Sequence, residues 1–424
     1  MGKVVELESS ARQRATGPRA PRKPRGRPRQ SKTALVLGGG GFTGAVYEIG
    51  ALRALDLLSV NRSVNQFDVY VGTSAGALVA ALTANGITPE QMMRVVNNKV
   101  PTPFRDINLD MLLRPNYREF VAKGIRLPLH LLGVARGLGR SLGSFSTVDL
   151  AIALAEALPS GLYSGSGLEE YVRTVLSDPD RTDDFRRLES ELYLAATDLD
   201  TCERLVLGAE GWDDVPISQA VRASAALPMV YQPVELKGRE LIDGGIVSTT
   251  NLDIAVEAGA KFIVVVNPLV PYVNDLSKEI PTLLGTKVRR VSDMGFPKIA
   301  YQTFKLLAYQ RLHEMARQWQ ERYPGVDIVL IEPEPDDELM FQTNILNYGS
   351  RLDIARHGFE SVTVKLASDY EDLREVAQRH GIEISATRVR KVVRHFAAEK
   401  EKSRAWRRIL EQTTGALLRQ SAAD

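Results

Sequence analysis

The sequence predicts a three-layer α/β/α protein with a mainly parallel central sheet, on the strength of two observations along its 424 residues. Short apolar runs at 33–37 and 67–71 each lead into a glycine-containing turn, as buried strands do. Each turn is followed by a segment with apolar residues at helical spacing, at 45–58 and 77–82. Strands that alternate with helices in this way imply a parallel sheet covered by helices on both faces.

The later elements follow from similar patterns. Asn85-Gly86 ends the second helix, and Thr88-Pro89-Glu90 has the pattern of a helix start, with an N-cap residue before proline. A helical pattern covers 285–322, with an interruption near Pro297. Further strands are predicted at 192–196, 205–207, 240–242, 262–266 and 327–331.

Composition divides the chain into three parts. Residues 1–32 carry ten Lys or Arg and two Glu, whereas the rest of the chain carries 44 basic and 50 acidic residues. Residues 9–32 contain no Leu, Ile, Val or aromatic residue, so 1–32 is predicted to be a disordered basic tail. Residues 33–368 are predicted to form the α/β domain, with a helical cap or insert at about 100–165. Residues 369–424 are charged and helix-prone, which predicts a helical C-terminal appendage.

Composition also excludes several classes of protein. Hydrophobic residues at 44% and charged residues at 25% are typical of a globular chain with its own core. The single cysteine, Cys202, excludes an intrachain disulfide framework and a multi-cysteine metal site. No apolar run approaches the roughly 18 residues of a membrane span, and the N-terminus lacks the apolar core of a secretory signal. A cytoplasmic protein is therefore expected.

The strongest catalytic signal is Gly72-Thr73-Ser74-Ala75-Gly76, which joins a predicted strand to a predicted helix. A G-x-S-x-G pattern at such a junction is typical of a nucleophile elbow, whose small flanking residues permit a sharp turn that exposes the serine hydroxyl. The helix dipole and free amides would then face the reacting oxygen. The alternative is an ordinary turn built of small residues.

A glycine run at Gly38–Gly41, followed by Gly44, lies at the preceding strand-to-helix junction. Exposed amides there would bind a phosphate or a developing oxyanion. A Walker A loop is excluded because no Gly-Lys-Ser/Thr follows. A dinucleotide site stays open, because the glycines fit G-x-G-x-x-G and Asp68 lies near the spacing of a ribose-binding acid, although Asp68 opens its strand where that acid should close one.

A third motif, Asp243-Gly244-Gly245, follows the predicted strand 240–242 and taken alone is typical of a turn. Together, the glycine loop, the serine elbow and the strand-end Asp-Gly-Gly resemble the patatin-like phospholipase family. The resemblance runs continuously over about residues 33–270. It is strengthened by three further blocks, AATDLD at 195–200, ASAALP at 223–228 and NILNYG at 344–349.

The resemblance implies a role for each of these residues. Ser74 would be the nucleophile and Asp243 its base, in a patatin-like fold that needs no metal or other cofactor. The oxyanion hole would be formed by the backbone amides of Gly39, Gly40, Gly41 and Ala75. The glycines that support the motifs would be Gly38, Gly44, Gly72, Gly76, Gly244 and Gly245.

The substrate that the resemblance implies is a lipid acyl ester, hydrolysed as by a phospholipase A or a lysophospholipase with release of a fatty acid. This chain departs from the family at Thr43, because Arg or Lys is usual just before the last glycine of the loop. It departs again after Gly245, where Ser248, Thr249 and Asn251 stand in a region that tends to Asn residues and a Pro. These differences predict weaker binding of an anionic head group and an altered substrate.

Two other functional interpretations remain open. A Ser-His-Asp triad would need a histidine, and His357 and His380 follow Asp243 in the chain order of α/β hydrolases. The remaining histidines of the chain are His130, His313 and His395. The second alternative is a nucleotide-binding or DNA- or membrane-tethered regulatory protein without hydrolase activity, which a serine-reactive fluorophosphonate would distinguish from a hydrolase.

Two basic segments suggest contact with anionic partners. Residues 121–148 place basic side chains among leucines, a composition suited to peripheral contact with an anionic membrane. The tail, residues 1–32, would be attracted to the same surface, and its PRGRP run at 24–28 resembles a hook for the DNA minor groove. The simpler interpretation of both segments is solvated basic chain, and no oligomeric state is predicted.

Overall fold

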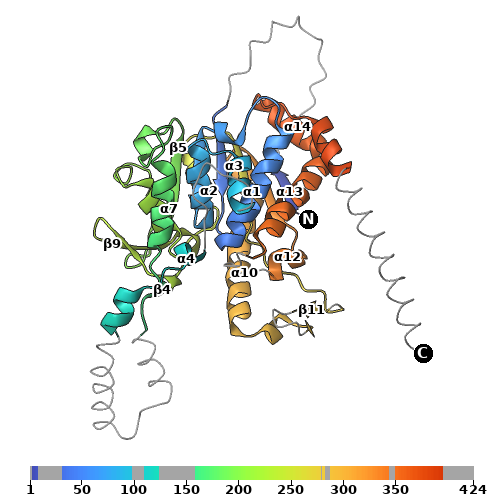
Figure 1. Ribbon diagram of the computed structural model, residues 1–424. Helices are drawn as coiled ribbons and strands as arrows, with labels where there is room; N and C mark the ends of the chain where they lie inside the picture. The colour runs from blue at the N-terminus through green and yellow to red at the C-terminus, as the bar shows by residue number, and fades with distance from the viewer. Residues whose placement is uncertain are drawn as a thin grey trace, which may run out of the picture.

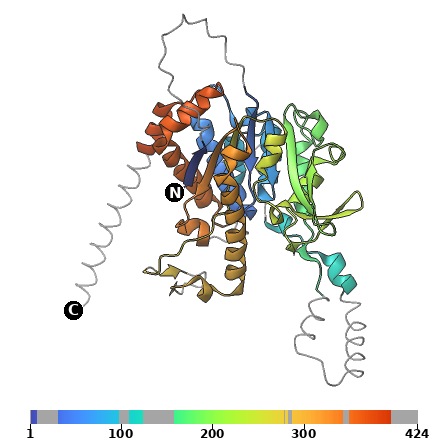
Figure 2. The ribbon, with the colours of Figure 1, turned by 180° about the vertical axis from the view of Figure 1, so that it is seen from behind.

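The computed structural model describes residues 2–7, 31–97, 109–123, 158–277, 279–281, 287–342 and 349–394. Within these ranges a nine-stranded central sheet has helices packed against both faces (Figures 1 and 2). The predicted three-layer α/β/α fold is therefore confirmed.

The centre of the sheet is parallel and its margins are antiparallel. The parallel strands are, in spatial order, β13 (Asp327–Pro333), β10 (Phe262–Val266), β2 (Thr33–Leu37), β3 (Val69–Thr73) and β5 (Glu191–Asp198). The antiparallel strands are β1 (Gly2–Leu7) beside β13, β6 (Arg204–Leu207) and β9 (Arg239–Asp243) beside β5, and β8 (Val234–Leu236) beside β9. Two smaller sheets pair β4 (Gly161–Tyr163) with β7 (Met229–Tyr231), and β11 (Ile280–Pro281) with β12 (Lys287–Val288).

Helices cover the two faces unequally. One face carries α1 (Gly41–Leu58), α2 (Ala75–Ala84), α3 (Pro89–Asn97), α7 (Ser166–Leu176), α8 (Ile217–Ser224), α13 (Arg351–Ser368) and α14 (Tyr370–Arg379). The other carries α9 (Leu252–Glu257), α10 (Phe296–Arg317) and α11 (Trp319–Arg322). Shorter helices are α4 (Leu109–Leu112) and α12 (Glu338–Gln342), with 3₁₀ turns at Val64–Gln66, Phe185–Arg187, Gly244–Ile246 and Val291–Met294.

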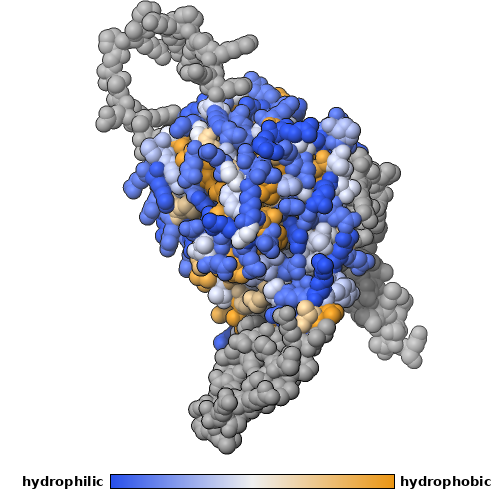
Figure 3. All heavy atoms as spheres, turned by 90° about the vertical axis from the view of Figure 1, so that its left-hand side faces the viewer, coloured by the Kyte–Doolittle hydropathy of each residue, from blue (hydrophilic) through white to orange (hydrophobic). Residues whose placement is uncertain are grey.

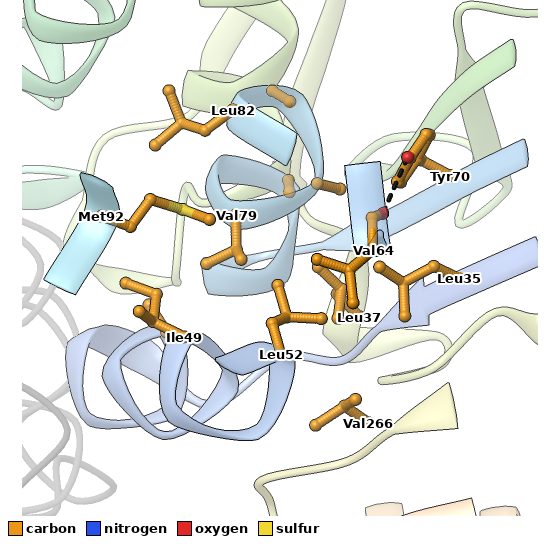
Figure 4. Packing of buried hydrophobic residues seen from close by; sticks show 14 of the residues in the cluster. Leu35, Leu37, Ile49, Leu52, Val64, Tyr70, Val79, Leu82, Met92 and Val266 are labelled. Atoms are coloured by element: carbon orange, nitrogen blue, oxygen red, sulfur yellow. Dashed lines mark hydrogen bonds between the residues drawn. The ribbon is translucent and has the colours of Figure 1, made fainter. Parts of the chain in front are cut away.

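Alternation along each central strand divides the core between these two faces. In β2, Leu35 and Leu37 join the larger cluster beneath α1, whereas Ala34 and Val36 join the smaller one beneath α9 and α11. All four side chains are fully buried. Figure 4 shows Leu35 and Leu37 packing with Leu52 of α1 and Val79 of α2, so β2 holds the first two helices against the sheet.

Most predicted elements are present, and the differences have local causes. Of the segment predicted as helix at 285–322, the first described residues instead form β12 and a 3₁₀ turn before α10 begins. Pro297 lies in the first turn of α10, where proline is tolerated because its missing N–H has no helical partner, so it begins the helix rather than interrupting it. The tail is also corrected in part, because Gly2–Leu7 pairs with β13. These residues, GKVVEL, carry two valines and a leucine, residue types that 9–32 lacks.

The described part of the predicted C-terminal appendage packs into the main core. Leu373 and Val376 of α14 and Val389 of a helix at 386–394 belong to the same hydrophobic cluster as β2 and α1. Most of the predicted tail (8–30), most of the predicted cap and basic segment (98–108 and 124–157), and residues 343–348 and 395–424 lie outside the described residues. None of the helices in the described ranges is both long enough and apolar enough to cross a bilayer.

Helices α1 and α13 cross at two glycines that bring their backbones together. A Cβ atom on Gly50 would lie 2.3 Å from the Ala355 carbonyl oxygen, and one on Gly358 would lie 2.6 Å from the Tyr47 carbonyl oxygen. Real Cβ atoms do not approach backbone oxygen so closely, so a side chain at either position would force the helices apart.

We expect Gly50→Ala to lower the free energy of unfolding by about 1–3 kcal/mol, the usual cost of overpacking a core. Urea denaturation followed by circular dichroism measures the change, with Arg356→Ala at an exposed position of α13 as control. Helix propensity alone would stabilise the variant by about 1 kcal/mol, so a gain in stability would contradict the close crossing.

Candidate active site

The register of three strands brings Ser74 and Asp243 together. β3 and β9 both pair with β5, with Thr73 opposite Ala195 and Asp243 opposite Ala196. Ser74 follows β3 directly and Asp243 is the last residue of β9, so the two side chains meet above β5. Although the central sheet is mainly parallel as predicted, Asp243 does not end a parallel strand, because β9 is antiparallel to β5 and stops level with the serine.

Ser74 occupies a strained turn between β3 and α2. Its backbone has φ 57° and ψ −121°, a combination that non-glycine residues rarely adopt and that is typical of a nucleophile elbow. The flanking glycines are required by close packing. A Cβ on Gly72 would lie 2.6 Å from the Cα of Ala77, and one on Gly76 would lie 2.4 Å from the Leu37 carbonyl oxygen.

The serine hydroxyl and the aspartate form a buried hydrogen bond. Ser74 Oγ donates to Asp243 Oδ2 at 2.5 Å, and Asp243 Oδ1 accepts from the Gly245 amide at 2.7 Å. Asp243 is only 2% exposed. Burial raises the pKa of its carboxyl to about 6, although the hydrogen bonds from Ser74 and Gly245 act in the opposite direction.

The glycine loop supplies fewer free amides than the sequence predicts. The Gly38 amide donates to the Val266 carbonyl and the Gly39 amide donates to the Thr249 carbonyl, each at 3.0 Å. Gly39 is therefore not an available oxyanion donor, because its N–H is already used in holding the loop. The amides of Gly40, Gly41 and Ala75 have no hydrogen-bond partner among the described residues.

A cavity of about 500 Å³ opens onto the Ser74–Asp243 pair. Of the predicted site residues it is lined by Ser74, Asp243, Gly39, Gly40, Gly41, Ala75 and Gly245. The other motif glycines, Gly38, Gly44, Gly72, Gly76 and Gly244, pack behind this wall. Most of the lining is apolar and comes from α2, α4, α7, β7 and α10, including Leu78, Leu112, Leu168, Met229, Tyr231 and Phe304.

Two polar residues that the sequence analysis gave no role hold the elbow in place. Ser224 Oγ accepts a hydrogen bond from the Ser74 amide at 3.0 Å and donates to the Ala195 carbonyl at 2.6 Å. Asn251 Nδ2 donates to Thr73 Oγ1 at 2.9 Å. Ser224 lies in the ASAALP block, so the resemblance marked its segment without indicating its contact.

The histidines in the described ranges have partners away from the cavity. His313 Nε2 lies 2.9 Å from Glu332, His357 Nε2 lies 2.5 Å from Asp337, and His380 Nε2 lies 2.8 Å from Asp327. None of the three lines the cavity, so the described residues do not form a Ser74-centred triad. His130 and His395 lie outside the described residues.

Asp68, the acid that a dinucleotide site would need, does not lie beside the glycine loop. Asp68 Oδ2 accepts from the amide and the hydroxyl of Thr33, both at 2.7 Å. Thr33 begins β2, whereas the glycine loop follows the last residue of β2. Asp68 and the loop therefore lie at opposite ends of the strands. The described residues also contain no group of His, Cys, Asp and Glu side chains suited to a metal ion.

A strained serine at a strand-to-helix turn, a buried carboxylate partner and free loop amides lie together beside an apolar cavity, which makes this the candidate active site of an α/β protein. The family model described as patatin-like phospholipase matches residues 35–256, and the chain belongs to this family.

Known proteins similar to this chain were found by sequence and by structure. A protein named probable lipid hydrolase 463L, from invertebrate iridescent virus 6, is 23% identical over 54% of this chain and 65% of its own length. The uncharacterized protein YqhO of Bacillus subtilis is 26% identical over 50% of this chain and 63% of its own length. The matched segment thus spans just under two thirds of both relatives.

Solved structures similar to this chain include two bacterial proteins. VipD from Legionella pneumophila is 14% identical, with a TM-score of 0.36 over 80% of this chain and 67% of that chain. ExoU from the type III secretion system of Pseudomonas aeruginosa, solved in complex with SpcU, is 16% identical, with a TM-score of 0.28 over 89% of this chain and 62% of that chain.

We expect Ser224→Ala to lower the free energy of unfolding by about 1–3 kcal/mol, because it leaves the buried Ser74 amide and Ala195 carbonyl without their partner. Denaturant titration measures this loss. Ser59→Ala is the matched control, since Ser59 Oγ is buried without a hydrogen-bond partner in the described structure. Equal stability of the two variants would refute the bracing role of Ser224.

Proposed function

We propose that this chain hydrolyses carboxylic esters of lipids through Ser74 and Asp243. The observation that carries the proposal is the 2.5 Å hydrogen bond between the two side chains at the wall of an apolar cavity. Asp243 accepts the serine proton as Ser74 Oγ attacks the acyl carbonyl, and returns that proton to the departing alcohol. Water activated by the same carboxylate then releases the fatty acid from the acyl-enzyme.

The backbone amides of Gly40, Gly41 and Ala75 stabilise the tetrahedral oxyanion in this proposal. These amides lie on two loops that begin at adjacent strand ends, β2 and β3, and they need no side chains. Aspartate is a weaker base than histidine, with reference pKa values of about 3.9 and 6.5, so much of the stabilisation has to come from such donors.

The substrate we propose is a phospholipid or lysophospholipid acyl ester. Support comes from the leucine-rich cavity wall, which suits an acyl chain, and from family membership. A regulator without hydrolase activity is the competing function, and the two differ in whether Ser74 reacts with an acylating reagent.

We expect Ser74→Ala and Asp243→Asn each to abolish hydrolysis of a soluble p-nitrophenyl ester and labelling by a fluorophosphonate probe. The first variant lacks the nucleophile, and the second lacks the carboxylate that accepts its proton. His313→Gln, His357→Gln and His380→Gln are controls that should keep activity within about tenfold, because none of these histidines reaches the cavity. Absence of labelling in the parent protein would favour the regulator.

We expect kcat/KM for a neutral soluble ester to fall as the pH drops through about 6. The pKa of Asp243 is raised to about 6 by burial, so its proton-accepting form dominates above that pH and disappears below it. The measurement is a pH-rate profile between about 4 and 8. A profile that stays flat down to about 4, the ordinary value for aspartate, would contradict the role of a buried base.

A membrane-facing surface is also part of the proposal. Exposed apolar side chains gather at the lower end of the face in Figure 3, and in Figure 1 α4 and β4 lie at the same end. Exposed apolar residues in and next to β4 and β7 and in the segment that follows α4 are Tyr117, Phe120, Val121, Leu162 and Met229, and Met229 is 81% exposed on the cavity rim. Val121 belongs to the predicted basic segment 121–148, of which residues 121–123 are described.

We expect Phe120→Glu combined with Met229→Glu to weaken sedimentation with phosphatidylglycerol vesicles by roughly tenfold, because two apolar contacts are lost and two negative charges face an anionic surface. Val60→Glu is the control. This exposed residue follows α1 and so lies at the other end of the strands from the glycine loop. An equal loss per added charge in both proteins would show that only the charge matters and would remove this surface from the proposal.

A further inference from the structure

The wall of the catalytic cavity offers no cation to an anionic substrate. Apart from Asp243, none of the described lining residues carries a charge at neutral pH. The glycine loop from Gly38 to Gly44 also lacks Lys and Arg. A phosphate brought in by a lipid head group would therefore need a positive charge from just behind the lining.

Lys305 of α10 lies in that position. It follows the lining residue Phe304 and is one helical turn beyond Tyr301, which also lines the cavity. Its Nζ lies 4.8 Å from the centroid of the Tyr301 ring, so the ring forms the layer of the wall that the ammonium contacts. Lys305 is only 2% exposed.

The charge on Lys305 is not neutralised within the described structure. No described residue forms an ion pair or hydrogen bond with its Nζ. Asp337 acts on it from a distance, but that carboxylate is already bound to His357 and to the Met340 amide. Burial, with repulsion from Lys298, lowers the pKa of Lys305 to about 8, which leaves the side chain mostly protonated at pH 7.

Other cations near the cavity differ from Lys305 in having partners. Arg114 pairs with Glu170 at 2.5 Å, and Arg222 pairs with Glu169 at 2.9 Å. Lys298, on the same helix, donates to the Phe341 carbonyl. A buried ammonium without such a partner is costly, so its retention beside the cavity is explained if an anion completes the site.

Resting on the proposed lipid hydrolysis, we propose that Lys305 binds the phosphate of a phospholipid substrate, reached when the Tyr301 ring moves aside, and so sets head-group specificity. The cation–π contact with Tyr301 holds the ammonium while the cavity is empty. The phosphate replaces that contact with a charge-assisted hydrogen bond, which is stronger.

The test uses the Ser74→Ala protein and measures how far each of two short-chain lipids raises its Tm. Dihexanoylphosphatidylglycerol and dihexanoylglycerol share their acyl chains, and only the first has a phosphate. Adding Lys305→Met should weaken binding of the phospholipid by about tenfold or more while the neutral lipid changes less than about twofold. Lys305→Arg should restore the preference, and Lys298→Met is the matched control that should retain it.

Several results would overturn the assignment. One is an unchanged preference in Lys305→Met; another is an equal loss for both lipids that Lys305→Arg does not restore, as expected of a purely structural residue. Inorganic phosphate and hexanoate test whether Lys305 binds a different anion. If either one raised Tm in a Lys305-dependent way and the phospholipid did not, the head group would be rejected as the ligand of Lys305. Failure of the parent protein to hydrolyse esters would instead refute the proposed function, because this comparison needs no turnover.

Discussion

The hydrogen bond between Ser74 and Asp243 joins positions 169 residues apart, and the rest of the site depends on the strand register that permits it. β5 lies between the two strands that carry these residues, so a slip of one residue on either side would turn a side chain to the opposite face. The Ser224 hydroxyl links the Ser74 amide to the Ala195 carbonyl of β5 and fixes the height of the elbow. The geometry of the candidate site is thus set by the sheet.

Burial connects this geometry to chemistry. The apolar surroundings that raise the pKa of Asp243 also form the wall of the cavity, so the same leucines that suit an acyl chain make the carboxylate a stronger base. A low-polarity site strengthens the attraction between loop amides and a developing oxyanion as well. In the proposed mechanism, desolvation of Asp243 offsets the lack of a histidine beside Ser74 in the described part of the chain, and it confines activity to a narrower pH range.

Local sequence pattern was sufficient for what depends on neighbouring residues. The runs at 33–37 and 262–266 form the strands that their apolar content predicts, and the small residues around Ser74 form the predicted elbow. What the sequence did not reveal depends on distant contacts. The Gly39 amide donates a hydrogen bond to the Thr249 carbonyl, and the strand Gly2–Leu7 pairs with β13, more than 300 residues away. Neither relationship leaves a periodic signal in the chain.

The segment that matches the family model, residues 35–256, is not a self-sufficient folding unit, because β10 and β13 follow it in the chain and extend the sheet beyond β2. A fragment ending at 256 would leave β2 as an unpaired edge strand. It would also lack α13, whose Gly358 packs closely against Tyr47 of α1. The glycine loop stands between β2 and α1, so it would lose support on both sides. For protein engineering, the boundary of sequence similarity is therefore a poor place to cut, and a transferable catalytic module has to include the strands and the helix that come after it.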